Sequence, residues 1–150
     1  MLTVGSPVPE VVLRNQQEEV VDLATLRGQR VLIFFYPKAN TPGCTQQACG
    51  LRDVAASVAG TVIVGISPDK PAGQKKFYDK YELGYDLLAD TEHTAAGAFG
   101  VWHEKVNYDK RYMGIGRSAF LIGTDGVVEQ AWCRISPADT PKKLLEAVVG

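Results

Sequence analysis

Residues 31–49 read VLIFFYPKANTPGCTQQAC, and this stretch predicts a strand, a turn and the start of a helix. The run VLIFFY is unbroken, apolar and rich in β-formers, and a second such run, TVIVGIS, occupies residues 61–67. Continuous rather than alternating hydrophobicity is typical of parallel, central strands that are covered on both faces. Between the two runs, apolar residues recur at spacings of three and four from Ala48 to Val58 and predict a helix over about residues 42–58. Strand, helix and parallel strand form a right-handed crossover unit.

The flanking sequence adds further elements around this unit. Apolar segments separated by turn residues predict an N-terminal hairpin (11–13 and 20–23), a helix (71–83), a short strand (85–88), a weaker helix (91–99), an antiparallel hairpin (118–122 and 127–135, with its turn at 124–126) and a terminal helix that begins at Thr140 and Pro141. This order predicts an α/β protein with a thioredoxin-like fold: a central mixed β-sheet with helices on both faces and an N-terminal β-hairpin.

Length and composition limit the classes of function. A chain of 150 residues buries roughly two-thirds of its surface on folding, so we expect a single domain over residues 1–150 that needs no disulfide to fold. The formal net charge of -1 gives no field to attract nucleic acid or an anionic membrane. The apolar runs are far shorter than the roughly 20 residues of a spanning helix, and the N-terminal residues show no basic stretch followed by an apolar core. We therefore expect a cytoplasmic protein without nucleic-acid or membrane partners, in a compartment that keeps thiols reduced.

Cys44 lies where the predicted helix begins. Thr41 is suited to the N-cap and Pro42 to the first helical position, which places Cys44 in the first turn. Unpaired backbone N–H groups and the positive end of the helix dipole favour an anion there. Because the thiolate is the nucleophilic form of cysteine, the position predicts a reactive thiol.

The segment PKANTPGC also contains the P-x-x-x-T-x-x-C signature of peroxiredoxins, at Pro37, Thr41 and Cys44. Together with GISPD, LLAD, FGVW and YMGIGRSAFLI, it resembles the bacterioferritin-comigratory-protein, or peroxiredoxin Q, subfamily over nearly the whole chain. The resemblance implies a thioredoxin-like fold and the reduction of hydrogen peroxide or alkyl hydroperoxides without a cofactor or metal. It also implies a monomer that is recycled by thioredoxin or a similar dithiol protein.

The resemblance assigns roles to five residues of this sequence. Cys44 would be the peroxidatic cysteine, Thr41 its hydrogen-bonding partner and Arg117 the guanidinium that completes the site, while Pro37 belongs to the signature and Cys49 would be the resolving cysteine. The chain departs modestly from its relatives, for example with Gln where similar sequences often have Glu, at position 47. That departure removes a possible charge contact.

The spacing of Cys44 and Cys49 has a consequence for a disulfide between them. On an intact helix, five residues separate the Cα atoms by about 8.7 Å, on opposite sides of the axis. A disulfide tolerates about 7 Å, so the helix would have to unwind locally after oxidation. Gly50, a poor helix former, lowers the cost of unwinding there.

Two other readings of the cysteines stay open at this point. A thiol–disulfide oxidoreductase without peroxidase activity is the nearest enzyme alternative, although the chain has no C-x-x-C motif. A zinc module would use the three cysteines with one histidine, at irregular spacings: Cys44, Cys49, Cys133 and His93 or His103. Cys133 itself alternates with Ala131 and Ile135 along a predicted strand, which predicts a buried structural cysteine.

Overall fold

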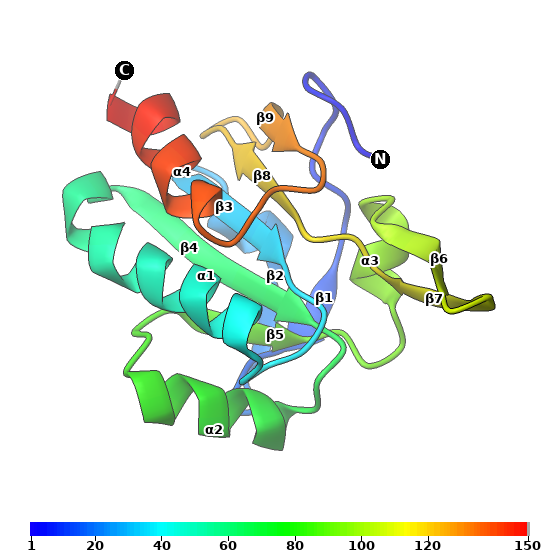
Figure 1. Cartoon of the computed structure of the whole chain (residues 1–150). Helices are drawn as coiled ribbons and strands as arrows, with labels where there is room; N and C mark the ends of the chain where they lie inside the picture. Colours follow the sequence, from blue (N-terminus) through cyan, green and yellow to red (C-terminus); the bar gives the residue numbers. More distant parts are fainter. Residues whose placement is uncertain (150) are drawn as a thin grey trace.

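A seven-stranded mixed sheet forms the centre of the protein in the computed structural model, which describes residues 1–149 (Figure 1). Its strands lie in the order β2-β1-β5-β4-β3-β8-β9, with bounds Val12–Arg14 (β1), Val20–Asp22 (β2), Arg30–Phe35 (β3), Thr61–Ser67 (β4), Asp86–Ala89 (β5), Ser118–Ile122 (β8) and Val128–Trp132 (β9). Strands β3, β4 and β5 are parallel, and the remaining pairs are antiparallel. The predicted mixed sheet and N-terminal hairpin are therefore confirmed.

The crossover unit predicted from residues 31–67 lies at the middle of this sheet. Strand β3 pairs with β4 in parallel, with Val31 opposite Val62 and Phe35 opposite Ile66. On its other side β3 pairs with β8 in the antiparallel sense. All residues of β3 after Arg30 are buried, which agrees with the unbroken hydrophobicity of the run.

Helices cover both faces of the sheet, as predicted. Three of them, α1 (Pro42–Val54), α2 (Pro71–Tyr81) and α4 (Asp139–Val149), lie on the near face in Figure 1, while the short α3 (Thr94–Ala98) lies on the other. Successive side chains of β3 divide between the two cores because strand side chains alternate. One core contains Leu32 and Phe34 of β3 together with Tyr36, which follows the strand, and the other contains Ile33 and Phe35.

The boundaries of several elements differ slightly from the predicted ones. Helix α1 ends at Val54, and the predicted remainder is a 3-10 turn, η2 (Ala55–Val58); a second 3-10 turn, η1 (Leu23–Leu26), follows β2. Helix α2 stops at Tyr81 because Glu82 adopts a left-handed conformation, with φ of 48°. None of these shifts changes the order of the elements. Along residues 1–149, no helix has both the length and the apolar character needed to cross a membrane.

A second, two-stranded sheet was not predicted from the sequence. Strands β6 (Trp102–Asn107) and β7 (Lys110–Ile115) pair with each other outside the main sheet and project from the molecule (Figure 1). The first four residues of β7 are exposed, so neither face of that segment needs an apolar stripe. The sequence of this segment therefore lacks the alternation of polar and apolar residues that marks a half-buried strand, and the strand was not predicted.

Candidate active site

The loop between β3 and α1 brings Cys44 to the carboxyl end of the central strands. Asn40 reverses the chain with a φ of 63°, a left-handed conformation that asparagine tolerates better than most residues. Thr41 follows with an extended backbone as the N-cap, and Pro42 begins the helix, as predicted. The Thr41 side chain makes no capping bond; its hydroxyl instead donates to the carbonyl of Lys38 at 2.8 Å.

Asp69 anchors this loop from the neighbouring strand. Its Oδ2 accepts a hydrogen bond of 2.7 Å from the backbone N–H of Ala39 and one of 2.6 Å from the hydroxyl of Ser67. Ser67 ends β4, the strand that is parallel to β3, so the carboxylate joins the two parallel strand ends to the loop that carries Cys44. The analysis of the sequence did not single out Asp69, although it lies in the segment GISPD.

Cys44 is buried in the first turn of α1 and faces Arg117. The Nη1 nitrogen of Arg117 lies 3.5 Å from Cys44 Sγ. Arg117 comes from the short connection between β7 and β8, so the fold unites residues that are distant in sequence. The guanidinium and the N-terminus of α1 both place positive charge next to the sulfur.

Gln47 holds Arg117 in this position. Its Oε1 accepts a hydrogen bond of 2.8 Å from the same Nη1, whose two hydrogens can serve Gln47 and the sulfur together. Its Nε2 donates to the hydroxyl of Thr140 in α4 at 2.9 Å. Gln47 is fully buried, and it lies one turn after Cys44 on the same face of α1. The sequence analysis singled out this position only as a departure from relatives. The spacing of three residues from Cys44 was the available signal that the two side chains share a helix face, and it was not used.

Two glycines of α1 lie where neighbouring segments come close. A Cβ atom on Gly43 would be 3.2 Å from Nη2 of Arg117, so this position has little room for a side chain. A Cβ atom on Gly50 would be 3.0 Å from the ring of Pro141 in α4. Gly50 therefore permits the close packing of α1 on α4, in addition to its weak helix propensity.

The other predicted site residues lie around this centre. Pro37 is exposed at the start of the loop. Cys49 is half-buried on α1, which is unbroken from Cys44 to Cys49, so the two thiols stand on one continuous helix. The hydroxyl of Tyr85 donates to the carbonyl of Ala48 at 2.8 Å and ties this part of α1 to the body of the protein.

The prediction that Cys133 is a buried structural cysteine is wrong. Strand β9 ends at Trp132, and Cys133 is exposed in the turn that follows. Arg134 has a left-handed backbone, with φ of 54°, which breaks the alternation assumed from Ala131 to Ile135. Ile135 is buried as predicted, because its side chain packs in the core beneath α1 and α4. Its backbone N–H donates to the carbonyl of Arg117.

The alternative of a zinc site finds no set of ligands in the described part of the chain. Within residues 1–149, no three side chains of His, Cys, Asp or Glu gather closely enough to hold a metal ion. His93 instead stacks on Trp102, with ring centroids 3.8 Å apart.

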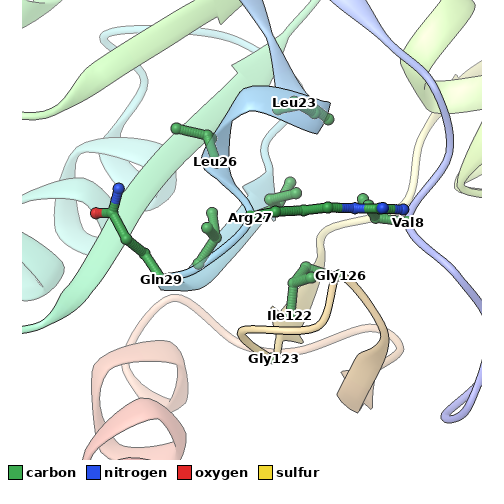
Figure 2. A pocket seen from close by; sticks show the side chains of 10 residues that line it. Val8, Leu23, Leu26, Arg27, Gln29, Ile122, Gly123 and Gly126 are labelled. Carbon is green, nitrogen blue, oxygen red and sulfur yellow. The ribbon is translucent and has the colours of Figure 1, made fainter.

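A separate crevice lies at the far end of the sheet from Cys44. It is enclosed by mostly apolar side chains around Leu23, Leu26 and Ile122, with Arg27 along one side (Figure 2). Its volume is about 10 Å³, which is room for a single water molecule. It lies at the start of β3, whereas Cys44 follows the end of that strand, so we regard it as a packing defect rather than a substrate site.

Comparisons with known proteins agree with the geometry around Cys44. Residues 4–131 match the AhpC/TSA family. The chain belongs to this family. It is 46% identical over 147 residues to a putative peroxiredoxin bcp of Haemophilus influenzae, covering 97% of this chain and 95% of that protein. It is 47% identical over 133 residues to peroxiredoxin Bcp of Escherichia coli, covering 87% of this chain and 85% of that protein.

Solved structures show the same relationship. The bacterioferritin comigratory protein of Xanthomonas campestris superposes with a TM-score of 0.91 at 29% identity, over 98% of each chain. BcpB of Mycobacterium tuberculosis superposes with a TM-score of 0.88 at 33% identity, over 99% of this chain and 97% of that one. The predicted membership of the Bcp, or peroxiredoxin Q, group of peroxiredoxins is confirmed. A peroxiredoxin is a thiol peroxidase that acts on peroxides and is recycled by a thiol reductant.

Proposed function

We propose that Cys44 is the peroxidatic cysteine and that it reduces hydrogen peroxide and organic hydroperoxides. The observation that carries the proposal is the buried Cys44 Sγ at a helix N-terminus, 3.5 Å from Arg117 Nη1. The thiolate attacks one oxygen of the peroxide, the O–O bond breaks, and the sulfur becomes a sulfenic acid. The leaving alkoxide or hydroxide takes a proton from solvent. Arg117 stabilises the negative charge that develops on the leaving oxygen.

Thr41 and Pro37 support this step by holding the peroxide and the loop. The Thr41 hydroxyl uses its hydrogen for the Lys38 carbonyl, so its lone pairs are free to accept a hydrogen bond from the peroxide O–H. Pro37 fixes one backbone angle at the start of the loop between β3 and α1. The family signature and this placement support the two roles.

The sulfenic acid is resolved by Cys49 in the same chain. Condensation of the Cys49 thiol with the sulfenic acid forms a disulfide and releases water. Since both residues lie on the continuous helix α1, the first turns of α1 must unwind before the sulfur atoms meet. Unwinding breaks the contacts of Gln47 with Arg117 and Thr140, which the reduced form keeps.

The cycle closes when a thioredoxin-like dithiol protein reduces this disulfide. When the first turns of α1 unwind, the disulfide between Cys44 and Cys49 becomes exposed. The reductant can then reach this disulfide. Because both cysteines come from one chain, a monomer is sufficient for the whole cycle. The cycle requires a steady supply of reduced dithiol, which the cytoplasm maintains, and we propose that compartment.

Replacement of Cys44 tests the central assignment. Cys44→Ser keeps the size of the side chain, so we expect loss of peroxide consumption with unchanged circular dichroism. Cys133→Ser is the matched control, because that thiol is exposed and outside the proposed cycle. Peroxide turnover by Cys44→Ser at the rate of the unmodified protein would exclude Cys44 as the peroxidatic residue and favour the alternative of a thiol–disulfide oxidoreductase.

A further inference from the structure

A groove of about 620 Å³ borders the Cys44 site and has no role in the chemistry described above. It lies between β6, the connection before β8 and the turn after β9. Arg117 belongs to both places, since it lines the groove and contacts Cys44 Sγ. Ligand pockets in proteins commonly measure about 300 to 1,000 Å³, so the groove is far larger than hydrogen peroxide requires.

The groove carries an excess of positive charge. Three cationic side chains line it, Lys105, Arg117 and Arg134, together with one carboxylate, Glu104. Glu104 already pairs with Arg111 on the neighbouring strand, at 3.5 Å. The cations of the groove therefore lack a matching carboxylate from its own lining.

Of the three cations that line the groove, Lys105 is the one that an anionic partner would stabilise most. It is half-buried, and its stem packs against Gly114 on the facing strand, where a Cβ atom would lie 3.1 Å from Lys105 Cδ. Among the side chains and backbone groups that the structure describes, none forms an ion pair or hydrogen bond with its ammonium. Burial lowers the pKa of Lys105, and the charge of Arg117 lowers it further, whereas Cys44 raises it. Two cations that repel each other in a shared groove are both stabilised when an anion binds between them.

We propose that Lys105 and the groove form a subsite for the carboxylate of an organic hydroperoxide whose peroxide group reaches Cys44. The inference rests on the proposed function of Cys44. Arg117 serves the peroxide end, and Lys105, which lines the groove from β6, serves the carboxylate end. Ile135 contributes an apolar wall for the hydrocarbon that joins the two ends. The natural substrates would then include hydroperoxides that carry a carboxylate.

The test compares two hydroperoxides that share the reacting group, one of which carries an additional carboxylate. Cumene hydroperoxide and its para-carboxylate present the same reacting group, and rapid quenching with mass spectrometry measures the rate of Cys44 oxidation by each. In Lys105→Gln we expect the ratio of the carboxylate rate to the cumene rate to fall about fivefold, as for a half-exposed ion pair. Lys110→Gln, which removes an exposed charge on the same hairpin and outside the groove, should leave the ratio unchanged.

Two further measurements separate a charge effect from damage to the fold. Lys105→Arg should keep the ratio near that of the unmodified protein, and in the unmodified protein the ratio should fall as salt concentration rises. An unchanged ratio in Lys105→Gln would overturn the subsite, whether both rates stay the same or both fall together. Slower reduction by thioredoxin with an unchanged ratio would also overturn it, by assigning the groove to the reductant. If the unmodified protein reduces hydrogen peroxide, the proposed function of Cys44 stands even when one of these results overturns the subsite.

Discussion

Gln47 Oε1 accepts a hydrogen bond of 2.8 Å from Arg117 Nη1. The same nitrogen faces Cys44 Sγ at 3.5 Å, so the amide fixes the guanidinium against the sulfur. Gln47 is itself held by Thr140, whose hydroxyl donates to the carbonyl of Ser136. The position of the Arg117 charge thus depends on a chain of hydrogen bonds that runs from α1 to the start of α4.

The first prediction concerns Gln47 as a positioning residue. Gln47→Ala removes the acceptor for Arg117 and the donor for Thr140, so we expect the second-order rate with peroxide to fall about tenfold, which corresponds to about 1.4 kcal/mol in barrier. Gln47→Glu keeps an acceptor for Arg117 and should retain most of the rate. Stopped-flow mixing with hydrogen peroxide provides the measurement.

A double-mutant cycle distinguishes positioning from a general loss of stability. If Gln47 acts through Arg117, its replacement should cost little once Arg117 is also changed to Lys. Strictly additive effects of the two substitutions on the peroxide rate would contradict the positioning role.

The second prediction concerns the shape of the cation at Arg117. Arg117→Lys keeps the charge but loses the planar fork that reaches Gln47 and the sulfur together, so the barrier should rise by about 1 to 3 kcal/mol. Arg117→Ala should raise it further. Arg14→Lys, an exposed arginine far from Cys44 in the sequence, serves as the control. Unchanged peroxide rates in both Arg117 variants would show that the guanidinium takes no part in the reaction.

The third prediction concerns the anchor of the Cys44 loop. Asp69→Asn replaces one carboxylate oxygen by a donor and weakens the bonds to Ala39 N–H and the Ser67 hydroxyl. We expect the free energy of unfolding to fall by about 1 to 2 kcal/mol and the peroxide rate to fall with it. Asp79→Asn breaks an exposed pair with Lys75 and should change the free energy by less than about 0.5 kcal/mol. Equal effects of the two substitutions in urea titrations would argue against the anchor.

The fourth prediction concerns the resolving thiol. After one equivalent of peroxide, mass spectrometry should find an intramolecular disulfide between Cys44 and Cys49. Hydrogen exchange should show residues 44–53 less protected than in the reduced protein, because the bond cannot form on an intact helix.

Two cysteine variants complete this test. Cys133→Ser should cycle with thioredoxin nearly as the unmodified protein does, whereas Cys49→Ser should react once and then stall or oxidise to the sulfinic acid. A peptide that links Cys44 to Cys133, with full turnover in Cys49→Ser, would refute the role of Cys49 and leave that of Cys44 untouched.

Local sequence was sufficient wherever neighbouring residues decide the structure. The apolar run of β3, the N-cap at Thr41 and Pro42 at the first helical position together predicted the strand, the turn and the start of α1. These signals act over a few residues, because backbone hydrogen bonding and side-chain sterics are local. They placed Cys44 in the first turn without reference to the rest of the chain.

Contacts between distant segments needed the tertiary structure. Arg117 lies 73 residues after Cys44, and Thr140 lies 93 residues after Gln47. Family resemblance named Arg117, but only the packing of β8 and α4 around α1 revealed that Gln47 holds it. The sequence also failed to predict that Cys133 is exposed. Strand β9 ends at Trp132 and Arg134 has a left-handed backbone, so the alternation of a strand does not continue to Cys133.

The sequence by itself therefore determined the fold class, the family and the position of Cys44 at a helix start, since periodicity, capping and a contiguous motif are written in adjacent residues. The tertiary structure alone decided how Arg117 is oriented, how Asp69 ties the loop to β4 and which cations share the groove beside Lys105. These arrangements arise when strands and helices pack, and the free energy that selects them comes from burial and hydrogen bonds between segments far apart in the chain.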